Sequence, residues 1–202
     1  MIDLIIDPEF RDLLPPLPDD KRKQLEENIL QNGIREPLVL WQGILIDGHN
    51  RYEIAKRHNL PFTTVDYQFN DRSDVRIWIV NNQFARRDLN AYERSLLALK
   101  IKPDIAKKAK ENQGTRSDLN IPQTFGESKE ETTDKEPQKN EHNNETDTQV
   151  AKLAGVSRET IRKVEKIEKH ATPEVKAAVK SGEISINEGY KQIKRAEKEN
   201  DF

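Results

Sequence analysis

The sequence predicts an α+β protein, in which a small α/β unit is followed by an all-α unit. Apolar residues alternate with period two in short runs before residue 85, which indicates strands. After residue 148 they recur only at helical spacing. Between these parts, residues 117–147 carry 3 basic and 9 acidic side chains and almost no large apolar residue after Phe125. We therefore predict two folded parts joined by a flexible acidic linker.

Composition narrows the class of protein. The 202 residues are 34% hydrophobic and 35% charged, which suits one or two modest domains rather than a single large core. There is no cysteine, so disulfides, thiol nucleophiles and thiolate metal sites are excluded. The four histidines show no metal-ligand spacing, and no metal site is predicted. No run approaches the ~20 apolar residues of a membrane span, so we expect a cytoplasmic protein without membrane contact.

Charge divides the chain into four segments. Counted from the sequence, residues 1–85 carry a net charge of -4, 86–116 of +5, 117–147 of -6 and 148–202 of +3. We interpret these as an N-terminal α/β domain, a basic connecting helix, the acidic linker and a helical domain. Pro103 is expected to kink or divide the connecting helix. We expect the basic residues of this helix to form a solvated outward face; the alternative is that they contact the phosphates of DNA. These residues are Arg94, Lys100, Lys102, Lys107, Lys108 and Lys110.

The secondary structure before residue 112 follows from local signals. Asp19 or Asp20 is able to cap a helix that ends at Asn32-Gly33, and Asn90 caps a later helix. Gln42-Gly43 marks a turn between two strands. The strands are expected near residues 2–6, 37–41, 44–46 and 62–67, and further helices after residue 50 and around 74–82.

Residues 46–52 combine a strand end, a glycine and a helix start. Such a junction directs unpaired backbone N–H groups and the positive end of the helix dipole at one place, where anions bind well. Gly48 lets the backbone approach a phosphate, and Arg51 is placed to add a bidentate grip. His49 and Asn50 add polar groups that a tight connection does not require. This short pattern alone leaves a tight connection and a phosphate site as open alternatives.

The order of elements around residues 47–52 resembles the N-terminal domain of the ParB partition family and its sulfiredoxin-like relatives. In ParB proteins the corresponding turn reads Gly-Glu-Arg-Arg and holds the triphosphate of CTP. This chain keeps Gly48 and Arg51, with His49 and Asn50 between them. The missing cysteine excludes sulfiredoxin chemistry. The resemblance therefore implies a nucleotide-binding α/β domain.

A second ParB motif, Glu-Asn-x-x-Arg-Glu-Asp-Leu, resembles residues 82–89, where Arg86 and the final Asp-Leu pair are retained. The acidic residue that accompanies magnesium in the family is replaced by an amide, Asn82, or Asn81 if the alignment slips by one residue. The resemblance implies a nucleoside triphosphate, CTP, with magnesium as cofactor. With the amide in place, hydrolysis is expected to be slow or absent. The implied nucleotide contacts are Gly48, His49, Asn50, Arg51, Asn82 and Arg86.

A phosphotransferase is an alternative from a different class. Some relatives with an Asp-Gly-His-His-Arg turn are nucleotide-dependent small-molecule kinases. On that interpretation Asp47, His49 and Arg51 would carry the reaction. Nucleotide turnover with and without DNA distinguishes the two classes.

The most specific signal is a helix-turn-helix pattern at residues 148–164. Ala151 is small enough for two helices to approach, Gly155 suits a left-handed turn, and Ser157 is able to cap the second helix. Such a second helix enters the major groove with its N-terminal residues at base edges. The alternative is an ordinary helical hairpin with a solvated face. The predicted DNA contacts are Ser157, Arg158, Glu159, Arg162 and Lys163.

The remaining residues predict a helix that opens at Thr172-Pro173-Glu174 and ends near Gly182, and a last helix from about Ile186. The order of helices again resembles ParB, and the resemblance covers most of residues 1–112 and 148–195. It implies a DNA-binding protein of plasmid or mobile-element partition, or of chromosome segregation. The implied partners are double-stranded DNA, a second copy of the chain and a partition ATPase. A plain helix-turn-helix transcriptional regulator is the remaining alternative.

Overall fold

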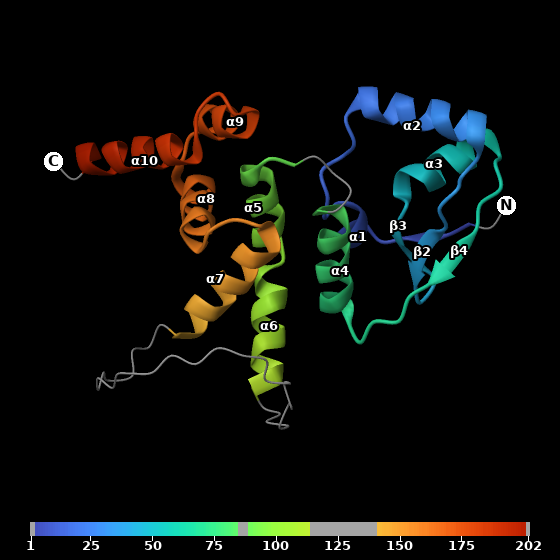
Figure 1. The fold of residues 1–202 in the computed structure, drawn as a ribbon, viewed down its shortest axis with the longest axis horizontal. Coiled ribbons are helices and arrows are strands. Elements are labelled where there is room, and N and C mark those ends of the chain that lie inside the picture. Colours follow the sequence, from blue (N-terminus) through green and yellow to red (C-terminus); the bar gives the residue numbers. More distant parts are fainter. Residues whose placement is uncertain (1–2, 85–88, 114–140, 201–202) are drawn as a thin grey trace, which may run out of the picture.

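The computed structural model describes residues 3–84, 89–113 and 141–200. The N-terminal part combines a small sheet with short helices, and the C-terminal part is built from helices only (Figure 1). This is the mixed α/β and all-α composition that the sequence predicts. Within the described ranges, no helix is both long and apolar enough to cross a membrane.

The sheet has four short strands in the order β1-β3-β2-β4. β2 and β3 form an antiparallel hairpin, and the outer strands β1 and β4 add to it in parallel. Gln42 and Gly43 both have positive φ, 50° and 78°, as a tight two-residue hairpin turn requires. The strands are β1 (Ile5–Ile6), β2 (Leu38–Trp41), β3 (Ile44–Asp47) and β4 (Thr64–Asp66).

In Figure 1, α2 and α3 lie above this sheet, and α1 and α4 lie to its left. One short helix was not predicted: α1 begins at Pro8, where Asp7 accepts a hydrogen bond from the Glu9 N–H. The predicted first strand shortens to two residues, and Ile5 stays 62% exposed at the sheet edge. The bounds are α1 (Pro8–Arg11), α2 (Asp19–Asn32), α3 (His49–His58) and α4 (Arg72–Phe84).

Six helices form the described C-terminal part. Asn90 makes a complete capping box with Glu93. The predicted connecting helix is divided just before Pro103, as expected, because one helix ends at Lys100 and the next begins at Lys102. Thr172 caps the helix that Pro173 opens, and Gly182 ends it in the left-handed conformation. The bounds are α5 (Ala91–Lys100), α6 (Lys102–Gln113), α7 (Glu141–Ala154), α8 (Arg158–His170), α9 (Pro173–Ser181) and α10 (Ile186–Asn200).

The structure corrects the C-terminal bound of the predicted linker. α7 begins at Glu141, inside the range 117–147, and Thr146 and Asp147 are buried. Composition suggested a solvated segment because these residues are polar, but two cationic side chains bind the Asp147 carboxylate and offset its burial. The remaining linker residues, 117–140, lie outside the described part of the chain.

The predicted connecting helix is two helices that pack into the C-terminal part. α5 and α6 both contact α7, and α5 also contacts α8. One apolar cluster continues from the N-terminal part through these helices, because it contains Val75 and Val80 of α4 as well as residues of α5 to α8. Its members from α5 to α8 include Leu97, Ala98, Ile105, Val150, Ala151, Ala154 and Ile161.

Lys100, Lys107 and Lys110 are exposed, as expected, whereas Lys108 is partly buried. Lys100 donates to the Leu13 carbonyl at 2.8 Å. Lys107 and Lys108 both bind the Asp71 carboxylate, at 3.2 and 3.1 Å. Because carboxylates and a carbonyl hold these three cations, they tie α5 and α6 to the N-terminal part. These contacts disfavour the alternative of a phosphate-binding face on these three residues.

Candidate nucleic-acid interface and glycine turn

The turn at the start of α3 is built around Gly48, which has φ 97° in the left-handed region. A Cβ at this position would lie 2.6 Å from Leu38 Cδ2, and the Leu38 side chain is fully buried. Only glycine therefore satisfies both the backbone angle and the space. No side chain caps α3. The first backbone N–H groups of the helix therefore have no side-chain cap, and the anion site that the sequence predicts here stays a prediction.

Arg51 is held by carboxylates. Its Nη2 donates to Asp47 Oδ2 at 2.9 Å, and its Nη1 donates to the Glu36 carbonyl oxygen at 2.9 Å and to Glu36 Oε2 at 3.2 Å. The side chain is 14% exposed. Gln83 of α4 also points its amide at Asp47, with Nε2 3.4 Å from Oδ1. In this arrangement the Arg51 guanidinium binds Asp47 and Glu36 and stabilises the turn. A contact between Arg51 and a phosphate stays a prediction.

His49 is partly buried next to this turn. Burial lowers the pKa of its imidazole below the ordinary value, despite the neighbouring Asp47 carboxylate, which acts in the opposite direction. Its Nε2 is buried and finds no hydrogen-bond partner among the described residues. Asn50 and Asn82 are partly exposed, and Arg86 lies outside the described residues. Burial therefore disfavours the charged form of His49, and its Nε2 faces no protein partner in the described part of the chain.

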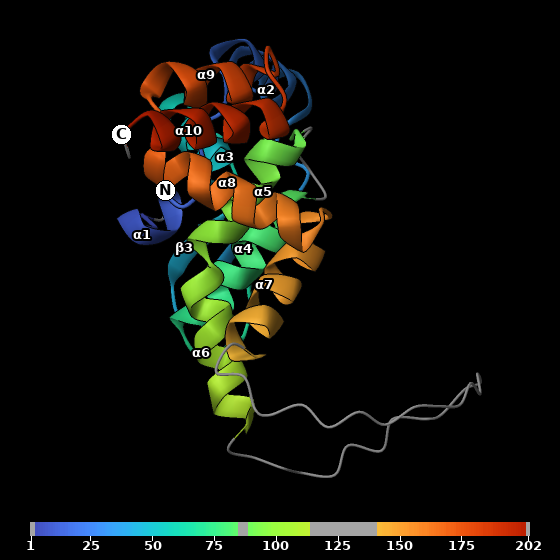
Figure 2. The ribbon, with the colours of Figure 1, turned by 90° about the vertical axis from the view of Figure 1, so that its left-hand side faces the viewer.

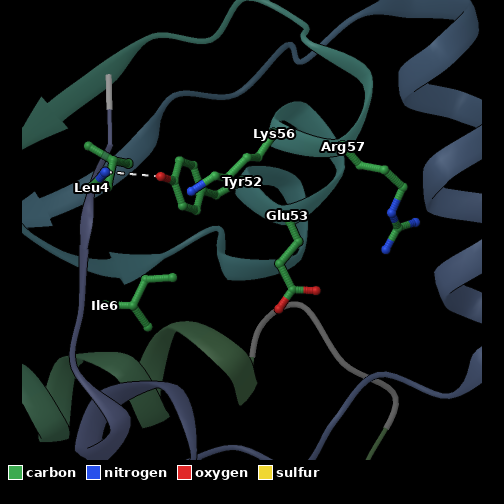
Figure 3. Close-up of a pocket in the computed structure, with 6 residues that line it drawn as sticks. All are labelled: Leu4, Ile6, Tyr52, Glu53, Lys56 and Arg57. Carbon is green, nitrogen blue, oxygen red and sulfur yellow. Dashed lines mark hydrogen bonds between the residues drawn. The ribbon is translucent and has the colours of Figure 1, made fainter. Parts of the chain in front are cut away.

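A hollow of about 390 Å³ lies beside the later turns of α3 (Figure 3). The Tyr52 hydroxyl accepts a hydrogen bond from the Leu4 N–H at 3.0 Å and closes one side of it. None of the predicted nucleotide contacts that the structure describes lines the hollow, so it is distinct from the start of α3. Its lining residues are Leu4, Ile6, Tyr52, Glu53, Lys56 and Arg57.

α7 and α8 are joined by a three-residue turn. Gly155 has φ 64°, and the Val156 N–H donates to the Ala151 carbonyl at 3.0 Å, which closes the end of α7. Ser157 then caps α8 by accepting from the Thr160 N–H at 3.1 Å. These are the roles that the sequence predicted for Gly155 and Ser157. Ala151 is buried between the helices, as its size requires.

Most of the predicted DNA contacts lie on the surface of α8. Ser157, Arg158, Glu159 and Arg162 are exposed. Lys163 differs: it is partly buried, bridging the Glu159 carboxylate at 2.6 Å and Asn187 Oδ1 at 2.8 Å. The structure therefore brings four of the five residues to one exposed end of α8, and it binds the fifth to α10. Figure 2 shows α8 between α7 and α10.

The sequence analysis did not predict a cluster of charged residues that joins α6, α7 and α8. Lys102 of α6 and Arg162 of α8 bind the two oxygens of Asp147, at 2.9 and 3.1 Å. Lys102 also binds Glu165 at 2.9 Å. Burial alone would raise the pKa of Asp147, but the bonds from Lys102 and Arg162 hold it below its ordinary value. One signal was available, because Asp147 shares the helical spacing of the apolar residues Val150, Ala151 and Ala154.

No protein-family model matches this chain, and no curated protein does. Solved structures do match. The structure of the C2221 form of a pNOB8-like ParB-N domain aligns with a TM-score of 0.61 and 20% identity, over 98% of this chain and 78% of that chain. A second pNOB8-like ParB N-domain aligns with a TM-score of 0.58 and 22% identity, over 96% and 72% of the two chains. The chain therefore has the fold of these ParB N-domains, as the sequence resemblance implied.

A more distant match is the C-terminally truncated chromosome-partitioning protein ParB from Caulobacter crescentus, complexed to the centromeric parS site. It aligns with a TM-score of 0.44 and 14% identity over 88% of this chain and 74% of that one. At this distance the two structures give no common frame for individual residues.

Proposed function

We propose that this protein is a ParB-like DNA-binding protein of plasmid or mobile-element partition, and that α8 is the helix that reads DNA. The observation that carries the proposal is the exposed N-terminal end of α8, with Ser157, Arg158, Glu159 and Arg162 together on a capped helix. Support for the partition role comes from the fold, which aligns with a pNOB8-like ParB-N domain over 98% of this chain.

The chemistry of this end of α8 suits a DNA duplex. A recognition helix contacts base edges with its first residues, and Arg158 and Arg162 are one turn apart on the same face. Arginine donates to guanine acceptors or to phosphate, and a serine hydroxyl is able to reach a phosphate oxygen. The helix dipole adds partial positive charge at the same place. We therefore expect specific binding with a strong dependence on salt.

The proposal includes a nucleotide at the Gly48 turn. The backbone N–H groups at the start of α3 supply an anion site, and the ParB resemblance suggests CTP. Asn50 is better placed than Arg51 to report on this contact, because Arg51 also holds Asp47 and Glu36. Either amide, Asn81 or Asn82, replaces the acid that accompanies magnesium in the family. Hydrolysis is accordingly expected to be slow or absent.

DNA binding is tested by selection of the purified full chain on a randomised duplex pool, followed by fluorescence anisotropy on the enriched duplex. We expect one enriched motif and a large loss of affinity in the double variant Arg158→Ala/Arg162→Ala. The matched control is Lys21→Ala/Lys23→Ala, which removes the same charge from exposed positions of α2. Equal weakening by both pairs, or no salt-dependent binding of the wild type, would contradict the proposal.

Nucleotide binding is tested by calorimetry with each of the four ribonucleoside triphosphates and magnesium, with and without the enriched duplex. We expect heat with CTP and a weaker response in Asn50→Ala than in Asn28→Ala, an exposed control on α2. Absence of heat with every triphosphate rejects the nucleotide site but leaves the DNA proposal standing. Rapid transfer of phosphate to a small molecule would instead favour the phosphotransferase interpretation.

A further inference from the structure

We propose that Asp147, itself held by Lys102, positions the Arg162 guanidinium to read a guanine in the major groove. This inference rests on the proposed function of α8 and assigns one base contact within it. Asp147 and Lys102 are positioning residues in this scheme, and Arg162 is the residue that touches the DNA.

Within this cluster, the Asp147 carboxylate is buried, whereas part of the Arg162 side chain is exposed. Asp147 is buried, and each of its two carboxylate oxygens binds a different cation, Lys102 at 2.9 Å and Arg162 at 3.1 Å. The bond to Arg162 is made by Nε, the nitrogen nearest the chain. The Arg162 side chain is nevertheless 50% exposed. Its inner end is therefore fixed in the protein, while the side chain reaches the surface that α8 offers to DNA.

Anchoring through Nε has a consequence for base reading. The guanidinium is planar, so a hydrogen bond at Nε orients the whole fork. Guanine presents two acceptors, N7 and O6, side by side in the major groove, and they match the fork of one arginine. Adenine presents an acceptor beside a donor and does not match. An oriented fork loses less rotamer freedom on binding, so the preference for guanine should depend on the anchor.

The charge balance of the cluster also suits DNA. A carboxylate beside Arg162 would by itself cancel the attraction of the guanidinium for a polyanion. Lys102 offsets this, because it binds Asp147 from the side of α6. Glu165 in turn binds both Lys102 and Lys169, at 2.9 and 3.0 Å. The two carboxylates thus face three cations, so the cluster keeps a net positive charge next to the exposed end of α8.

The alternative is that the cluster only holds the three helices together. The readout that separates the two roles is sequence preference, because a purely structural bond changes stability without changing which base is preferred. The first step is to find the guanine that Arg162 contacts. Replacing this guanine by adenine should weaken DNA binding by the wild type but not by Arg162→Ala. We expect this replacement to cost the wild type about 5- to 150-fold in affinity.

The deciding variant is Asp147→Asn, measured in the full chain on the selected duplex and on its guanine-to-adenine counterpart. We expect the preference for guanine to fall at least threefold, while affinity for an unrelated duplex does not fall, because the substitution removes a negative charge beside the DNA surface. In an Arg162→Ala background, Asp147→Asn should have no further effect on the preference. The matched control is Glu165→Gln, which removes the same charge and a bond to Lys102 without touching Arg162, and it should leave the preference intact.

A second measurement tests the bond between Asp147 and Arg162 without a substitution at Asp147. In nitrogen-15 NMR spectra of the wild type, the Arg162 Nε–H should exchange with water more slowly than that of Arg158, which is exposed at the start of the same helix. Equal exchange, or an unchanged guanine preference in a folded Asp147→Asn, overturns the inference while DNA binding stands. A wild type that binds no duplex preferentially overturns the proposed function itself.

Discussion

Two glycine turns in this molecule use the same backbone device in opposite surroundings. Gly48 and Gly155 both have φ in the left-handed region: Gly48 comes directly before α3, and Gly155 begins the three-residue turn before α8. Around Gly48 the space is closed, with Leu38 Cδ2 2.6 Å from a hypothetical Cβ, whereas no atom lies within 4 Å of a Cβ at Gly155. One turn is packed into a core, and the other is open at the surface. A local pattern alone does not distinguish these outcomes.

The arginines that follow the two turns repeat the contrast. Arg51 and Arg162 each bind a buried aspartate, Asp47 and Asp147. Arg51 is 14% exposed and makes its bonds through both terminal nitrogens, while Arg162 is 50% exposed and its bond to Asp147 uses Nε. The same pair of residue types therefore closes one turn and presents a cation at the other. Five predictions test this comparison.

The largest effect is expected from Arg51→Ala. The substitution removes two cationic nitrogens from the buried Asp47 and from Glu36, so we expect the free energy of unfolding to fall by about 3 kcal/mol. Arg158→Ala, at an exposed position after the other turn, should change it by less than about 0.5 kcal/mol. Urea denaturation followed by circular dichroism measures both. Similar values for the two variants would remove the contrast between the turns.

Gly48→Ala should be the next most damaging. The new Cβ meets Leu38 in a fully buried site and the backbone is strained, so we expect a loss of about 2–3 kcal/mol in the free energy of unfolding. At Gly155, where the space is open, Gly155→Ala has only the backbone strain to overcome, about 1 kcal/mol. Gly155→Asn should lose less, because asparagine tolerates the left-handed region better. Thermal unfolding of the three variants gives the order.

Arg162→Ala tests the open turn through function rather than stability. We expect a cost of about 1–3 kcal/mol in binding free energy on the preferred duplex and little change on random DNA. If Arg162 touches only phosphate, both affinities should fall alike and the log–log salt slope should flatten by about one unit. Arg51→Ala, measured at a temperature where it is folded, should leave the preference between duplexes unchanged.

Ser157→Ala removes the hydroxyl that accepts from the Thr160 N–H at the start of α8. We expect the free energy of unfolding to fall by about 1 kcal/mol, the usual cost of losing a helix cap. Ser157→Asp should restore the cap, and it should weaken DNA binding because a carboxylate then faces the phosphates. Differential scanning calorimetry and anisotropy together check this pair. A Ser157→Asp variant that binds DNA like the wild type would show that this end of α8 is not the interface.

The smallest effect concerns His49 and pH. Burial lowers its pKa in the folded state, so the unfolded chain binds the proton more tightly. Stability should therefore decrease as the pH falls through the ordinary value of 6.5 toward the folded-state pKa. His49→Gln should lose this part of the pH dependence, while His170→Gln, at an exposed position, should keep it. Chemical denaturation at a series of pH values between 7.5 and 5.5 provides the measurement.

The sequence by itself determined the elements whose signals are local. The Gln42-Gly43 hairpin, the cap at Asn90, the Ser157 cap and the helix opened by Pro173 all appear where the sequence places them. Caps and turns involve neighbours within about four residues, so their geometry is set before distant parts of the chain meet. The resemblance to ParB could be recognised for a related reason, since its motifs surround such turns.

Only the tertiary structure decided which charged groups meet. Arg162 lies 15 residues from Asp147, and Lys102 lies 63 residues from Glu165. Nothing in local spacing connects such positions, because their contact depends on how α6, α7 and α8 pack. The same packing buried Asp147 in a segment that composition assigned to an acidic linker. In the N-terminal part, the placement of α3 beside the chain before β2 brought Arg51 to Glu36, 15 residues away. Side-chain direction at a surface or in a core is a property of the assembled helices and strands, and no single segment encodes it.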